Sequence, residues 1–170
     1  MDNLTATARY MTGHDLMLVT AESCTAGLIA SHLADVPGAG HLLDCAFVVY
    51  SEAAKRNCLG VRSETIEAHG LTSEAVAREM ALGALRRSRA NLAVANTGVA
   101  DDGGDGTPPG TQCYAWAFSG DGQSGTATVF TETRRFDGDR SAVREASARW
   151  ALERIADHHA RLATAPDGQS

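Results

Sequence analysis

The chain has 170 residues, of which 44% are hydrophobic, and this composition fits one soluble globular domain with a substantial core. Its net charge of −6 and pI near 5.4 argue against nucleic acid or a membrane surface as a partner. The N-terminal residues lack the basic and apolar segments of a signal peptide, and no run reaches the roughly 20 apolar residues of a membrane helix. We therefore expect a cytoplasmic protein that contacts no membrane.

The first part of the chain alternates between predicted strands and helices. The apolar run Leu16–Val19 predicts a strand, and the apolar periodicity of Cys24–Ala34 predicts a helix after a tight turn. A turn at Pro37–Gly40 leads to a second strand, Cys45–Tyr50, which a short helical segment at Ser51–Asn57 follows.

The middle of the chain continues this alternation and then breaks into a loop. Thr65–Ala68 predicts a short helix, and Thr72-Ser73 caps a long helix that ends near Arg87. Leu92–Thr97 predicts a third strand. The segment Gly98–Gly110 is too rich in glycine, aspartate and proline to form anything but a loop.

The last part of the chain predicts a hairpin and one helix. The strands Gln112–Phe118 and Thr126–Arg134 flank a turn around Gly120-Asp121-Gly122, and the helix starts near Asp139. Residues 1–163 then form one domain, and the polar segment Thr164–Ser170 is expected to be a disordered tail. Strands that alternate with helices favour an α/β domain with a mixed sheet.

The segment Thr20–Gly27, with the sequence TAESCTAG, is the most informative stretch of the chain. It joins a predicted strand to a predicted helix, so Ser23 lies beside the backbone N–H groups of a helix N-terminus. Such a position suits a nucleophile or a bound anion. On turn chemistry alone, capping of the helix by Ser23 or Thr25 is the simpler interpretation.

Polar residues also follow two other predicted strands. Tyr50-Ser51 and Lys55 follow the second strand, and Asn96-Thr97 ends the third. Because ligands collect at the carboxyl ends of strands in α/β sheets, we expect these residues to lie close to Ser23. A partly desolvated lysine has a lowered pKa and can act as a base toward a serine, although Lys55 by itself is typical of a solvated surface residue.

Two arginines and an acidic loop are further candidates for ligand binding. Arg140 and Arg144 share a helix face, and a guanidinium can hold a phosphate or carboxylate through paired hydrogen bonds. Surface ion pairs around an Asp139 cap are an equal alternative. The loop Asp101–Gly106 matches a calcium loop only loosely, because Gln112 stands where a bidentate glutamate is required. We therefore predict no metal site.

The cysteines and histidines show no metal-ligand spacing. The pair His158-His159, near the end of the last predicted helix, is expected to be solvated. Four cysteines without C-x-x-C spacing predict reduced and mostly buried thiols. They are Cys24, Cys45, Cys58 and Cys113.

A series of motifs resembles the CinA C-terminal domain family, in the same order along the chain. The first motifs are Ala21–Gly27, Val36–Gly38 and Phe47–Lys55 with the sequence FVVYSEAAK. The others are Leu59–Val61, His69-Gly70, Ser73–Met80, Asn96–Ala100 and Phe136–Arg144. The resemblance covers roughly residues 5–157 of the chain.

The resemblance implies an α/β/α sandwich and, for active members, an amidohydrolase that uses neither metal nor cofactor. These members convert the pyridine nucleotide nicotinamide mononucleotide to nicotinate mononucleotide and ammonia. The resemblance further implies that Ser23 attacks the amide carbon, that Lys55 is the general base and that Tyr50 assists proton transfer. The implied substrate-binding residues are Glu22, Thr25, Thr97, Gly98 and, for the anionic group, Arg140 or as second choice Arg144.

The chain departs from the family pattern at two places. Ala26 stands where the family has the first glycine of a Gly-Gly pair. In the loop, Asp101-Asp102 replaces Gly-Pro, and Thr107 stands in place of a lysine. These changes add negative charge and remove a base, so the loop repels a phosphate that touches it.

Three functional hypotheses follow from these observations. The chain is an amidohydrolase of nicotinamide mononucleotide, an amidase that acts on a non-phosphorylated amide, or a diverged member that binds a nucleotide or a protein without turnover. The sequence leaves the oligomeric state open, with a homo-oligomer as one option.

Overall fold

The computed structural model describes residues 3–120 and 125–164. Most of the predicted turn at residues 120–122 and of the predicted tail from Thr164 lies outside these ranges.

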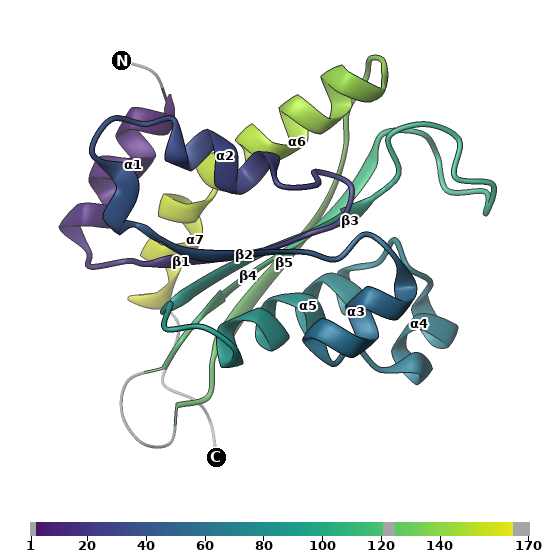
Figure 1. Cartoon of the computed structure of the whole chain (residues 1–170), viewed down its shortest axis with the longest axis horizontal. Helices are drawn as coiled ribbons and strands as arrows, with labels where there is room; N and C mark the ends of the chain where they lie inside the picture. The colour runs from purple at the N-terminus through teal and green to yellow at the C-terminus, as the bar shows by residue number, and fades with distance from the viewer. Residues whose placement is uncertain (1–2, 121–124, 165–170) are drawn as a thin grey trace.

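A mixed β-sheet forms the middle layer of the molecule (Figure 1). Its strands are β1 (Leu18–Glu22), β2 (Leu43–Val48), β3 (Leu92–Gly98), β4 (Thr111–Phe118) and β5 (Thr128–Arg135). The strand order is β2-β1-β3-β4-β5. β1 pairs in parallel with β2 and β3, whereas β4 pairs antiparallel with β3 and β5. The predicted α/β class with a mixed sheet is confirmed.

Helices cover both faces of this sheet (Figure 1). One face carries α1 (Asn3–Gly13), α2 (Leu28–Ala34), α6 (Arg140–Glu153) and α7 (Ile155–Leu162). The opposite face carries α3 (Glu52–Leu59), α4 (Ser63–His69) and α5 (Glu74–Arg86). No helix within the described residues is long and apolar enough to span a membrane.

The two faces of the sheet present side chains of different size. Because successive side chains of a strand point to opposite faces, Tyr114 and Trp116 of β4 pack under α6 and α7. Ala93 and Ala115 of β3 and β4 face α5, whose buried residues are themselves mostly small. The short side chains let α5 approach the sheet closely, and this packing holds the layer that carries α3.

The helices differ from the prediction at three places. No predicted element covers α1, which packs through Leu4, Ala8 and Met11. The predicted last helix is two helices, because the chain bends at Arg154 between α6 and α7. The helix predicted from Cys24 begins only at Leu28. Residues 26 and 27 have positive φ angles of 48° and 98°, which a right-handed helix does not accommodate.

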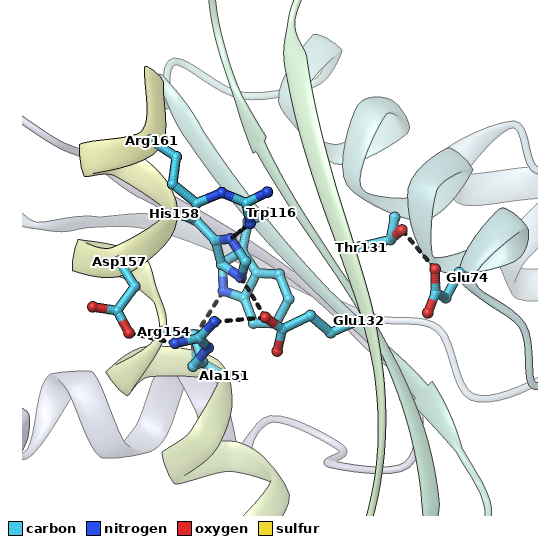
Figure 2. A network of polar contacts seen from close by, with 9 residues as sticks. All are labelled: Glu74, Trp116, Thr131, Glu132, Ala151, Arg154, Asp157, His158 and Arg161. Atoms are coloured by element: carbon cyan, nitrogen blue, oxygen red, sulfur yellow. Dashed lines mark hydrogen bonds and ion pairs between the residues drawn. The ribbon is translucent and has the colours of Figure 1, made fainter. Parts of the chain in front are cut away.

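His158 of α7 is fully buried, so the prediction of a solvated histidine pair is wrong. Its ring stacks on Phe130 at 5.1 Å and lies 4.3 Å from the Trp116 ring, measured between centroids. Its Nε2 lies 3.2 Å from the carboxylate of Glu132, which also accepts a 2.7 Å hydrogen bond from Arg154 (Figure 2). The apolar face of α7 thus packs against β5, and this contact buries His158.

Candidate active site

The sheet topology collects the predicted functional segments at one edge. The carboxyl ends of the parallel strands β1, β2 and β3 share this edge, and β5, which runs antiparallel to β4, ends there before α6 begins. The connections that leave β1 and β2 run over opposite faces of the sheet, so the end of β1 is a topological switch point. Ser23 follows β1 directly.

Ser23 and Lys55 are in direct contact although they lie in different elements. The Nζ atom of Lys55, in α3, donates hydrogen bonds to Ser23 Oγ at 2.9 Å and to the carbonyls of Val49 at 3.0 Å and Tyr50 at 3.1 Å. Lys55 is 2% exposed and Ser23 is 7% exposed. Burial lowers the pKa of Lys55 to about 8, against the opposing effect of the Glu52 charge.

This arrangement suits a lysine that acts as a base. A protonated amine has three N–H bonds, and the two carbonyls and Ser23 Oγ occupy all three. A neutral Lys55 that keeps its two carbonyl partners therefore directs its lone pair toward Ser23 Oγ. With a pKa of about 8, roughly a quarter of the Lys55 side chains are neutral at pH 7.5. The pair can supply an activated serine nucleophile.

Glu22 supports the loop that carries Ser23 from inside the protein. Its carboxylate is fully buried, and both oxygens accept hydrogen bonds. The five donors are the hydroxyls of Thr20 and Thr25 and the backbone N–H groups of Gly27, Ile29 and Ala30. Glu22 thus binds the Thr25 hydroxyl and caps α2, and contact of Glu22 or Thr25 with substrate stays a prediction.

A buried amide network, which the sequence analysis did not identify, joins the Ser23 loop to the glycine-rich loop. Asn96 accepts a hydrogen bond from the Thr25 N–H at 3.2 Å and donates to Gln112 at 2.9 Å. Gln112 in turn donates to the Val99 carbonyl at 3.1 Å. Gln112 follows a turn-rich loop. The sequence around it gives no signal for its part in this network, because its hydrogen-bond partners belong to other elements.

Thr97 and Gly98 end β3 at the same edge of the sheet. The Thr97 hydroxyl donates to the Leu71 carbonyl at 2.9 Å, so it ties β3 to the segment before α5. A Cβ atom at Gly98 would lie 2.5 Å from the Gln112 side chain. Glycine is therefore required at position 98 for the close approach of Gln112. Direct contact of Thr97 or Gly98 with substrate stays a prediction.

The two candidate arginines have different surroundings. The Arg144 guanidinium donates to the carbonyls of Cys24 at 2.9 Å and Thr25 at 3.2 Å, so it holds the Ser23 loop. Arg140 is half exposed, and it donates to Asp101 at 2.9 Å and to the Tyr50 phenol oxygen at 2.7 Å. Arg140 is thus the more exposed of the two arginines, and its role in binding an anion stays a prediction.

Within the described part of the chain, no group of three or more His, Cys, Asp or Glu side chains could hold a metal ion. All four cysteines are free, as predicted, but only Cys24 and Cys113 are fully buried.

Known proteins resemble this chain in sequence and in fold. Residues 3–159 match the model of the CinA C-terminal domain. The chain belongs to the CinA C-terminal domain family. This CinA domain is 40% identical over 141 residues to the nicotinamide-nucleotide amidohydrolase PncC of Escherichia coli, and the match covers 81% of each chain. The crystal structure of a CinA superfamily protein from Klebsiella pneumoniae is 37% identical, with a TM-score of 0.84 over 96% of this chain and 98% of that one.

Several other relatives of this CinA domain are longer proteins. The putative competence-damage inducible protein of Symbiobacterium thermophilum is 44% identical over 154 residues, which are 88% of this chain but 36% of that protein. A CinA-like protein of Akkermansia muciniphila is 41% identical over 87% of this chain and 35% of its own length. The CinA domain thus spans about a third of the length of these relatives.

Proposed function

We propose that this CinA domain hydrolyses the carboxamide of nicotinamide mononucleotide to nicotinate mononucleotide and ammonia. The observation that carries the proposal is the 2.9 Å contact between Lys55 Nζ and Ser23 Oγ at the switch point of the sheet. The similarity to the Escherichia coli nicotinamide-nucleotide amidohydrolase, at 40% identity over 81% of both chains, supports the same reaction.

The proposed reaction has two halves that use the same base. Ser23 Oγ attacks the amide carbon while its proton passes to Lys55, and the tetrahedral intermediate then expels ammonia with a proton returned by Lys55. Water attacks the resulting acyl-serine ester with Lys55 again as base, which releases the carboxylic acid and restores Ser23. Arg140 holds the phosphate. Tyr50 acts through its carbonyl, which positions Lys55, and we keep its assistance in proton transfer as a prediction.

The first test is ammonia release from nicotinamide mononucleotide. We expect Ser23→Ala to lower kcat by about a thousandfold or more, because the variant has no nucleophile. Ser31→Ala, at an exposed position of α2, is the matched control and should retain the activity of the unmodified chain. Full activity of a folded Ser23→Ala variant would contradict the mechanism. Binding of the nucleotide to the unmodified chain without any product would instead favour the role of a non-catalytic binding protein.

One observation favours an amidase of non-phosphorylated amides as a second candidate. In the structure, the Asp101 carboxylate already accepts a hydrogen bond from Arg140, the residue that we propose to bind the phosphate. A substrate without phosphate does not have to displace this carboxylate.

A further inference from the structure

Arg140 has both of its terminal nitrogens engaged within the protein. Nη1 donates to the Asp101 carboxylate at 2.9 Å, and Nη2 donates to the Tyr50 phenol oxygen at 2.7 Å. These contacts use two of the five N–H donors of the guanidinium, so an external phosphate or carboxylate that binds Arg140 either replaces one of these partners or binds beside the Asp101 carboxylate. In either case an anionic group of a substrate meets the negative charge of Asp101 at Arg140.

The two residues before Asp101 are held by packing and backbone hydrogen bonds. The preceding residue, Ala100, is 5% exposed. It lies in a small apolar cluster with Cys24 of the Ser23 loop and Val143 of α6. Val99 is held by backbone hydrogen bonds to Thr111 and from Gly110, both of 3.0 Å. The base of the acidic loop is thus anchored against the same helix that carries Arg140.

The other acidic residues of this loop have different partners. Asp102 accepts a 2.9 Å hydrogen bond from the Gly104 N–H, and Asp105 accepts one of the same length from the Thr107 N–H. Both carboxylates close turns inside the loop. Asp102 is therefore a matched control for Asp101, because it has the same charge and the neighbouring position but a partner other than Arg140.

We propose that Asp101 is a specificity-determining residue that competes with the anionic group of a substrate for Arg140. This inference rests on the proposed function. A phosphorylated amide must displace the carboxylate or bind beside its negative charge, whereas an amide with an uncharged hydroxyl at the same place does neither. Asp101 thus shifts the selectivity of the site toward non-phosphorylated amides. An exposed ion pair and one like-charge repulsion of this kind amount to about a tenfold change in relative preference.

The test compares two probes that differ only in a phosphate, nicotinamide mononucleotide and nicotinamide riboside. We expect Asp101→Asn to raise the ratio of kcat/KM for the nucleotide over the riboside by about tenfold relative to the unmodified chain. Asp102→Asn should change this ratio by less than about twofold. An equal ratio in the Asp101→Asn variant and the unmodified chain would overturn the proposal, and so would an increase of the same size in Asp102→Asn.

A binding experiment separates this inference from the proposed function. Calorimetry with nicotinamide mononucleotide compares Ser23→Ala with the double variant Ser23→Ala, Asp101→Asn, in which no turnover occurs. We expect the double variant to bind the nucleotide about tenfold more tightly. Tighter binding without ammonia release by the unmodified chain would support the role of Asp101 and contradict the proposed reaction. Ammonia release with no gain in affinity would support the reaction and overturn the role of Asp101.

Discussion

At the scale of single residues, Lys55 is the charged side chain whose surroundings matter most for the proposed chemistry. An ammonium group that is 2% exposed lacks the hydration it has in the unfolded chain, and this loss lowers its pKa to about 8. The two carbonyls that accept from Nζ belong to Val49 and Tyr50, so the β2–α3 connection holds the amine against Ser23.

This pKa predicts the pH dependence of the reaction. Only neutral Lys55 accepts the Ser23 proton, and the neutral fraction rises with pH until the pH exceeds the pKa of about 8. We expect kcat/KM for nicotinamide mononucleotide to rise about fifteenfold between pH 6.5 and 8 and to level off above pH 9. Lys55→Arg, which stays protonated throughout, should be inactive at every pH. A flat profile of the unmodified chain would contradict Lys55 as the base.

Ala26 shows the structural consequence of a departure from the family pattern. Its φ of 48° lies in the left-handed region, where a side chain costs roughly 1 kcal/mol. We expect Ala26→Gly to raise the free energy of unfolding by about 0.5–1 kcal/mol, measured by urea denaturation. Ala6→Gly, in the exposed face of α1, should lower it by a similar amount because it weakens a regular helix. A loss of stability in Ala26→Gly would show that the strain is absent.

At the scale of elements, the attachment of α7 to β5 depends on a buried histidine (Figure 2). Burial lowers the pKa of His158, and the charge of Glu132 opposes this effect. Because the unfolded histidine has its ordinary pKa of about 6.5, the unfolded chain binds a proton below this pH that the folded chain does not bind. The His158 contribution to stability is therefore present at neutral pH and is lost as the pH falls below about 6.5.

Urea denaturation at pH 7.5 and 5.5 tests this prediction. We expect His158→Phe, which retains a ring between Trp116 and Phe130, to lose less stability on acidification than the unmodified chain, by at most about 1.4 kcal/mol per pH unit. His41→Phe, at the exposed turn after Gly38, is the control and should leave the pH dependence unchanged. Identical pH dependence in all three chains would contradict a neutral buried His158. The titration of Glu132, whose pKa Arg154 lowers despite burial, lies below this pH range.

At the scale of the whole molecule, the three layers bring together segments that are far apart in the chain. The site combines the ends of β1 and β3, the start of α3 and the start of α6, and the sheet order places all of them at one edge (Figure 1). We propose that residues 1–163 form one domain, since α1 and α7, near the two ends of the described chain, both pack into the same core.

Local patterns in the sequence predicted the strands and most of the helices of the described chain, but not α1. Hydrophobic alternation located all five strands to within a few residues, and Ser73 caps α5 as predicted, through a hydrogen bond from the Val76 N–H. The same patterns placed Ser23, Lys55 and Arg140 near strand or helix ends. These predictions succeed because periodicity, capping and turn chemistry depend on residues within one or two turns of each other.

Only the tertiary structure decided what each side chain contacts. Ser23 and Lys55 are 32 residues apart, Asp101 and Arg140 are 39 apart, and Cys24 and Arg144 are 120 apart. Such pairs leave no local pattern, because burial and partner choice arise when the layers pack. The sequence by itself therefore determined the α/β class, the family and the candidate nucleophile and base. The packing decided that Glu22 caps α2 and that Arg144 holds the Ser23 loop. It also decided that Arg140 faces solvent and donates a hydrogen bond to Asp101.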